Sequence, residues 1–167
     1  IISAGDIDGD GLGDVLITGR TRSGSSGRNV VYLYKGSTLL KLRDSVVTFA
    51  DADLRFFEAS FKVLAGDFDH DGKSDLIAAA MSSGLWILKQ GDDGAWTSSI
   101  IDKDSSGFEH TSYGADLNKD GKLELYVAAD EQGSLNQYLW DGQQFSKTKI
   151  GDIPENTITW NIVSGVF

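Results

Sequence analysis

Three copies of one acidic loop constrain the fold of this chain more than any other feature. Each copy carries oxygen-bearing side chains at relative positions 1, 3, 5 and 9, and glycine at position 6. The copies occupy residues 6–14, 67–75 and 116–124, so their starts lie 61 and 49 residues apart. A period of this size is typical of repeat architectures, in which each repeat is one supersecondary unit.

The side chains of these loops suit a hard divalent cation. Ca²⁺ takes six to eight oxygen ligands at about 2.3–2.6 Å, and glycine supplies the backbone angles that fold a chain back around an ion. An EF-hand would need a bidentate Glu at loop position 12, where this chain has Ile17, Ala78 and Val127. For any single loop the alternative is a solvated acidic turn that binds nothing, because Asp-Gly is a favoured turn pair.

Short apolar runs around each loop predict an all-β fold. They are rich in β-branched and aromatic residues and are bounded by Gly, Asp, Asn and Ser. No window keeps a helical pattern over the ten or twelve residues of a typical helix. We expect four strands in each unit, at residues 1–5, 15–18, 30–36 and 41–49, then 61–66, 76–80, 85–91 and 95–102, then 111–115, 125–129, 137–142 and 144–152. Continuously apolar strands indicate sheets covered on both faces, as in the blades of a β-propeller.

We therefore predict a single partial β-propeller domain over residues 1–167, built from four-stranded antiparallel blades. Its units cover approximately residues 1–57, 58–106 and 107–156, and residues 157–167 begin a further blade. Known propellers contain about four to eight blades, so three blades and one strand do not close a ring. We expect the remaining blades to come from a longer chain or from another copy.

The loops and their flanking strands resemble the FG-GAP/VCBS repeat family, whose members include the calcium-binding blades of the integrin α-subunit head. The resemblance covers essentially the whole chain and implies up to three Ca²⁺ ions, bound in the hairpins between the first and second strands of the blades. It implies side-chain ligands from the loops and one backbone carbonyl in each, from Leu12, Lys73 and Lys122. The implied side-chain ligands are Asp6, Asp8, Asp10 and Asp14, then Asp67, Asp69, Asp71 and Asp75, then Asp116, Asn118, Asp120 and Glu124. We expect the third site to bind most weakly, because Asn118 removes a charge and Glu124 lengthens the last ligand.

The charge of the chain is concentrated in the loops. The formal net charge is −10, and the three loops carry −4, −3 and −1 of it. Carboxylates packed this closely repel one another unless a cation neutralises them. An acidic chain without a basic cluster is a poor candidate for binding nucleic acid, and no apolar run is long enough to span a bilayer. Exposed loops of this kind suit millimolar calcium, which favours an extracellular, secreted or cell-surface location, with the periplasm as an alternative.

No catalytic constellation is visible in the sequence. We expect His70 and His110 to be ordinary turn and strand residues, and spacing gives no reason to choose an acid–base pair from Glu109, Asp130 and Glu131. The leading hypothesis is a non-enzymatic, integrin-like adhesion or binding module for a protein or a glycan. Trp96 and Trp140 are its candidates for stacking on a sugar, and residues 19–28 and 51–57 are its candidate binding loops. The alternative is part of a polysaccharide-active enzyme, lyase-like or dehydratase-like, built on a calcium-bearing propeller.

Overall fold

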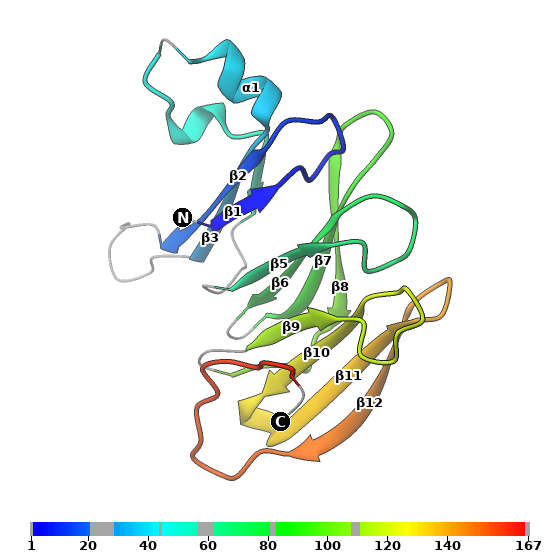
Figure 1. Cartoon of the computed structure of the whole chain (residues 1–167). Coiled ribbons are helices and arrows are strands. Elements are labelled where there is room, and N and C mark those ends of the chain that lie inside the picture. The colour runs from blue at the N-terminus through cyan, green and yellow to red at the C-terminus, as the bar shows by residue number, and fades with distance from the viewer. Residues whose placement is uncertain are drawn as a thin grey trace.

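The computed structural model describes residues 2–20, 29–43, 45–56, 62–80, 83–107 and 111–165. Within these ranges, twelve strands form three four-stranded antiparallel sheets (Figure 1). Neighbouring strands in each sheet follow the order of the chain, so every sheet is a simple meander. The predicted all-β fold with four-stranded antiparallel blades is confirmed.

The strands of each sheet are consecutive in sequence. The first sheet contains β1 (Ile2–Gly5), β2 (Asp14–Arg20), β3 (Asn29–Tyr34) and β4 (Leu54–Phe56). The second contains β5 (Val63–Gly66), β6 (Asp75–Ala80), β7 (Gly84–Gln90) and β8 (Trp96–Asp102). The third contains β9 (Ser112–Ala115), β10 (Glu124–Ala129), β11 (Ser134–Trp140) and β12 (Phe145–Asp152).

Helical structure is sparse in the described part of the chain. It comprises the α-helix α1 (Gly36–Lys41) and the short 3₁₀ helices η2 (Phe49–Asp51) and η3 (Asp130–Gln132). None of the described helices has the length and hydropathy needed to cross a membrane.

The predicted fourth strand of the first unit, at residues 41–49, is wrong. Helix α1 ends at Lys41, η2 begins at Phe49, and the fourth strand is β4, after both helices. Val46 and Val47, in the middle of that segment, are 89% and 40% exposed. The predicted fourth strands of the other two units are confirmed to within one residue by β8 and β12.

Helix α1 is fixed by contacts that are distant in sequence. The Asp53 carboxylate accepts hydrogen bonds from the backbone N–H of Lys35 and from the Thr38 hydroxyl, both over 2.8 Å. At the first residue of the helix, a Cβ on Gly36 would lie 2.6 Å from the Cβ of Leu12. Only glycine allows the helix to approach the first acidic loop this closely, and a six-residue helix would be marginal without such contacts.

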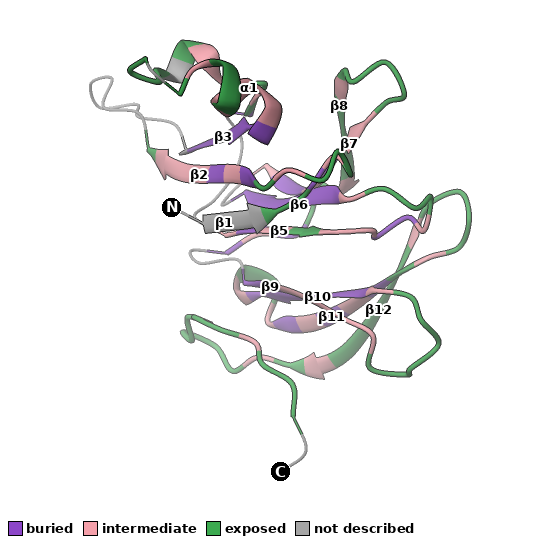
Figure 2. Ribbon diagram, turned by 45° about the horizontal axis from the view of Figure 1, so that its top comes forward, coloured by how far each residue is buried: buried purple, intermediate pink, exposed green. Residues whose placement is uncertain are grey.

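The core lies between the sheets. Leu16, Val31 and Leu33 of the first sheet pack against Leu76 and Ala78 of the second. Ile77 and Ala79 lie on the opposite face of β6. They face the third sheet and pack with Leu125, Val127 and Tyr138. All six residues of β6 are buried, as are all six of β10 (Figure 2). The second sheet is therefore covered on both faces, as its continuously apolar sequence predicts.

Phe68 joins the second and third sheets at the base of the second acidic loop. Its ring is 1% exposed and lies against two glycines, one from each sheet. A Cβ on Gly114 would lie 2.7 Å from the ring, and a Cβ on Gly66 would lie 3.3 Å from it. These glycines provide the space for an aromatic side chain between the sheets.

The C-terminal residues 153–165 contain no strand and return to the third sheet. The backbone N–H of Thr159 donates to the Asp130 carboxylate over 2.9 Å, and the Thr111 hydroxyl donates to the Thr159 carbonyl. The Tyr113 and Ser164 hydroxyl oxygens are 2.7 Å apart. That residues 157–167 begin a further blade stays a prediction.

Candidate metal-binding loops

Each acidic loop joins the first and second strands of one sheet. Loop one (residues 6–14) follows β1, loop two (67–75) follows β5, and loop three (116–124) follows β9. In each case the residue at position 9 pairs with the residue that precedes position 1, as in Gly66 with Asp75 and Ala115 with Glu124. The three loops project from the same side of the molecule (Figure 1).

The carboxylate at position 1 organises each loop. Its first oxygen accepts the backbone N–H of position 5 over 3.1 Å, and its second accepts the N–H of position 6 over 2.9–3.0 Å. These distances agree within 0.1 Å in all three loops, with Asp6, Asp67 and Asp116 as the acceptors. The turn is therefore held by its own hydrogen bonds.

The side chains at positions 3 and 5 complete the turn. The N–H of position 5 also donates to the side-chain oxygen of position 3, over 3.2 Å to Asp8, 3.2 Å to Asp69 and 2.8 Å to Asn118. The N–H of position 7 donates to the position 5 carboxylate over 2.8–2.9 Å in every loop. These are Asx-type bonds, in which an Asp or Asn side chain accepts from the backbone two residues later.

Positions 4 and 6 both adopt the left-handed backbone conformation. At position 6 this falls on Gly11, Gly72 and Gly121, with φ between 84° and 89°. At position 4 it falls on Gly9 but also on His70 and Lys119, whose φ values are 60° and 61°. A left-handed non-glycine residue costs free energy, and loops two and three both keep one at the same place. The glycine at position 6 was predicted from the sequence; the strain at position 4 was not.

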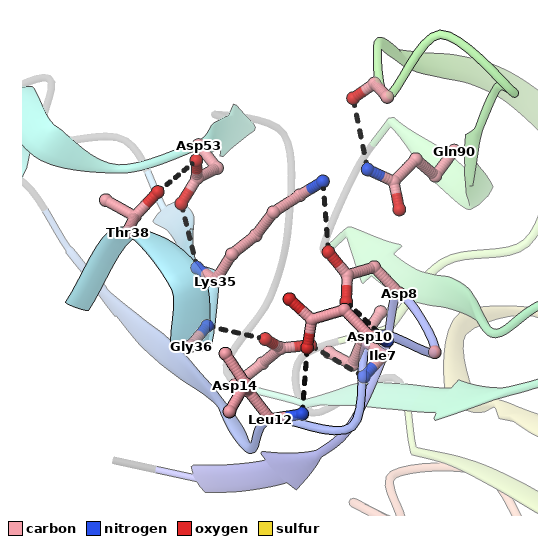
Figure 3. Close-up of polar contacts among 12 residues, drawn as sticks. Ile7, Asp8, Asp10, Leu12, Asp14, Lys35, Gly36, Thr38, Asp53 and Gln90 are labelled. Atoms are coloured by element: carbon pink, nitrogen blue, oxygen red, sulfur yellow. Dashed lines mark hydrogen bonds and ion pairs between the residues drawn. The ribbon is translucent and has the colours of Figure 1, made fainter. Parts of the chain in front are cut away.

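The carboxylates at position 9 are buried. Asp14, Asp75 and Glu124 are each 2% exposed. Each accepts the backbone N–H of position 2 of its own loop, over 2.6 Å from Ile7, 3.0 Å from Phe68 and 2.9 Å from Leu117. The other oxygen of Asp14 accepts the N–H of Gly36 over 2.8 Å, which attaches the loop to helix α1 (Figure 3). This residue therefore closes the loop in addition to its predicted role as a ligand.

The donor atoms of each loop converge. Three side chains per loop place one carboxylate oxygen each within 4.8 Å of the others, namely Asp6, Asp8 and Asp10, then Asp67, Asp69 and Asp71, then Asp116, Asp120 and Glu124. Hard oxygen donors of this kind suit Ca²⁺.

Two buried carboxylates also fit a cation. Burial, reinforced by the negative charge of Asp69, raises the pKa of Asp75 to about 7. In loop three, the Oε1 atom of Glu124 is buried without a hydrogen-bond partner. A divalent ion would compensate both, because it favours the charged form of nearby carboxylates. Some predicted ligands lie in the loops but are not among the three converging carboxylates of each loop. They are the side chains of Asp14, Asp75 and Asn118 and the carbonyls of Leu12, Lys73 and Lys122.

Two lysines that the sequence analysis did not consider reach the loops. Lys35, directly after β3, lies 3.2 Å from Asp8 (Figure 3), and Lys89 of β7 forms an ion pair with Asp69. The pKa of Lys89 is raised, chiefly by its hydrogen bond with Asp69. Both partners occupy position 3 of their loops. The sequence does show a lysine near the end of the third strand in the first two units. It could not show that these lysines reach the acidic loops, because the direction of their side chains depends on tertiary packing.

The sequence was compared with models of known protein families. The model of the FG-GAP-like repeat matches residues 6–78 and, a second time, residues 67–127. The chain belongs to the FG-GAP-like repeat family. Each of the two FG-GAP-like matches begins at the first aspartate of an acidic loop and contains two of the three loops. No curated protein matches the chain.

Other residues that the sequence analysis considered in this FG-GAP-like chain make hydrogen bonds that connect segments of the fold. The His70 ring lies 3.3 Å from the Leu123 carbonyl and thus connects loop two to the end of loop three. Asp130 accepts the Thr159 N–H, and Glu131 accepts the Ser106 hydroxyl over 2.7 Å. His110, Glu109, residues 21–28 and residue 57 lie outside the described residues.

The two candidate tryptophans differ in their surroundings. Trp96 packs against the core between the first two sheets, which argues against its predicted role in stacking on a sugar. Trp140 lines a pocket of about 240 Å³ between the second and third sheets, together with Lys89, Ser99, Gln143 and Phe145. The Lys89 ammonium lies 5.6 Å from the centre of the Trp140 ring. This pocket combines an aromatic ring with polar side chains, as small-molecule sites commonly do.

Proposed function

We propose that this chain is a calcium-binding β-propeller module in which each acidic loop holds one Ca²⁺ ion. The observation that carries the proposal is the threefold recurrence of one loop geometry, with converging carboxylates and a buried carboxylate at position 9. The proposed side-chain ligands are those at positions 1, 3, 5 and 9 of each loop. The proposed backbone ligands are the carbonyls of Leu12, Lys73 and Lys122.

In this proposal calcium has a structural role. The ion would supply positive charge to carboxylates that otherwise repel one another. Because it binds the folded loop and not the unfolded chain, it stabilises the fold by mass action, by about 2.7 kcal/mol per site at one hundred times the Kd. The residues of the loop hold its shape through hydrogen bonds: those of positions 1, 3 and 5 fix the turn, and the carboxylate at position 9 closes the loop at its base.

We further propose that the module works outside the cell as a binding or adhesion unit for a protein or a glycan. Calcium of extracellular concentration matches the affinity expected for exposed oxygen-ligand loops. The pocket beside Trp140 supports a glycan partner. We also propose that the remaining blades of the propeller come from a longer chain or a second copy. The exposure of Leu117 supports this part of the proposal: this loop-three residue is 50% exposed, whereas its equivalents Ile7 and Phe68 are buried against the next sheet.

A calcium titration tests the metal proposal. We expect isothermal titration calorimetry to show binding of up to three Ca²⁺ ions. We also expect thermal unfolding to occur at a higher Tm in about 2 mM calcium than in EDTA. Asp10→Asn, Asp71→Asn and Asp120→Asn combined should abolish most of that difference while keeping the Tm in EDTA. The control is Asp141→Asn, because Asp141 also accepts backbone N–H groups in an acidic turn but lies outside the loops. An equal Tm in calcium and EDTA for the unmodified chain would refute the metal proposal.

The binding role has a separate test. We expect a glycan array probed with the labelled chain to show retention in calcium and its loss in EDTA. Trp140→Ala should weaken that retention, whereas Trp96→Phe should leave it unchanged. Calcium-independent turnover of a polysaccharide by the chain would instead support the enzyme alternative.

A further inference from the structure

Two lysines stand in the same relation to two of the acidic loops. Lys35 and Lys89 come from the third strand of their sheets or the residue just after it, and each pairs with the carboxylate at position 3. The Asp8 and Asp69 side chains are only 12% and 3% exposed, so water screens these ion pairs weakly. The Lys35 side chain is itself only 17% exposed.

Loop three lacks both halves of this ion pair. Its position 3 is the neutral Asn118, whose amide donates to the Asp120 carboxylate over 3.2 Å. The third strand of its sheet ends in Trp140, and Asp141 follows. Among the described residues, none of the recorded ion pairs reaches a loop-three carboxylate. Thus a lysine is present where position 3 carries a charge and absent where it does not.

The two differences in loop three, a neutral residue at position 3 and the missing lysine, offset each other in formal charge. Loops one and two each have four carboxylates at the predicted ligand positions, and the paired lysine brings the formal charge of each set from −4 to −3. Loop three has three carboxylates at these positions and no such lysine, which gives the same −3. This count leaves out Lys73, Lys119 and Lys122, which belong to loops two and three but form none of the ion pairs with a position 3 side chain that the described residues show; Lys73 pairs with Asp92.

We propose that Lys35 and Lys89 are internal counter-cations that hold loops one and two in their folded shape and set their affinity for metal. This inference rests on the proposed calcium binding. Each lysine neutralises a buried position 3 carboxylate before an ion arrives, and it must yield that oxygen, or share it with a second cation, when the ion binds. Loop three has no lysine at this place to compete with an ion, and on this inference Asn118 alone is not expected to make it the weakest site; the order of the three affinities stays a prediction.

The test removes the lysine charge and keeps its aliphatic stem. We expect Lys35→Met and Lys89→Met to tighten one calcium constant each, by about threefold to tenfold, and to lower the Tm in EDTA while largely restoring it in calcium. The Kd values come from calorimetry in competition with a chelator, and a tenfold change corresponds to about 1.4 kcal/mol. Lys147→Met is the matched control, because Lys147 pairs with Asp102 at 2.7 Å, outside the loops; its calcium constants should not change.

A variant of loop three tests the same inference by adding a negative charge at position 3. Asn118→Asp adds a fourth carboxylate to loop three without a lysine, and should tighten a third calcium constant while lowering the Tm in EDTA. Normal calcium binding with unchanged constants in both lysine variants would overturn this inference and leave the proposed function intact. Absence of calcium binding in the unmodified chain and in all variants would overturn both. If a lysine variant folds only in calcium, the role of the lysine in holding the loop is supported.

Discussion

At the scale of single residues, the acidic loops show how much of a site a short stretch of chain can build for itself. The hydrogen bonds of positions 1, 3 and 5 join groups at most five residues apart and recur in all three loops, and those of position 1 have nearly the same lengths in each. Such local bonds depend on residue type and spacing, which are visible in the sequence. The prediction of acidic turns with glycine at position 6 therefore agreed with the structure.

The backbone of position 6 should matter whether or not metal is present. Gly72 has φ of 89° and open space around its Cβ position, so a larger residue is opposed by backbone conformation and not by crowding. We expect Gly72→Val to lower the free energy of unfolding by about 1–3 kcal/mol in calcium and in EDTA alike. Chemical denaturation in both conditions measures this. A loss seen only in calcium would show that the turn relaxes when no ion is bound.

At the scale of elements, the contacts between neighbouring sheets depend on small residues at chosen places. Gly114 of β9 lies against the Phe68 ring, and a Cβ there would come within 2.7 Å of it. Strand β9 was predictable from its apolar residues, but the need for glycine at this position was not. It arises from the Phe68 side chain of the second acidic loop, 46 residues earlier in the chain.

We expect Gly114→Ala to destabilise the chain by about 1–3 kcal/mol, because the added methyl group overpacks a filled space. Gly19→Ala is the control, since a Cβ on Gly19 in strand β2 meets nothing within 4 Å. Denaturant midpoints of the two variants, compared with the unmodified chain, give the difference. Similar midpoints for the two variants would contradict the packing argument, and Phe68→Leu should partly rescue Gly114→Ala.

Asp102 connects the second and third sheets electrostatically. Its carboxylate accepts hydrogen bonds from the Tyr138 hydroxyl and the Lys147 ammonium, both over 2.7 Å. Burial acts to raise the pKa of Asp102, but the hydrogen bonds from Lys147 and Tyr138 outweigh it and lower the pKa below 3.8. The stabilisation is therefore fully present above the ordinary pKa and is lost as the pH falls through the lower pKa of the folded state.

Acid unfolding should reveal this contribution. We expect the Tm of the unmodified chain in EDTA to fall more steeply below about pH 4 than the Tm of Asp102→Asn, which lacks the titrating group. Asp104→Asn is the control, because the Asp104 side chain is exposed; its pH profile should follow the unmodified chain. Parallel profiles for Asp102→Asn and the unmodified chain would show that Asp102 does not stabilise the contact between the sheets.

At the scale of the whole molecule, equivalent residues differ because their neighbours differ. Position 2 of the loops is always apolar, with Ile7 3% exposed, Phe68 1% exposed and Leu117 50% exposed. The first two face the next sheet along the chain, and the third has no such sheet among the described residues. Sequence patterning alone gives these three positions the same expected burial.

Substitutions at this position should therefore have unequal effects in the 167-residue chain. We expect Ile7→Ala to cost about 2–5 kcal/mol, because it leaves a cavity in a packed core, and Leu117→Ala to cost less than about 0.5 kcal/mol. Equilibrium unfolding in urea measures both. A large cost at Leu117 would mean that a second copy or another segment covers the third sheet in solution.

Residue types and their spacing were enough to predict the repeat, the acidic loops, the family and the four strands of the second and third units, because these depend on local spacing and on hydrophobic runs buried on both faces. Tertiary contacts were needed for the first unit, where helix α1 and the late strand β4 replace the expected strand at residues 41–49, since Asp53 and the first loop hold that helix from a distance. Tertiary packing likewise brings Lys35 and Lys89 to position 3 of their loops. Those contacts depend on strand register and on the packing of whole sheets, which residues far apart in the chain set together.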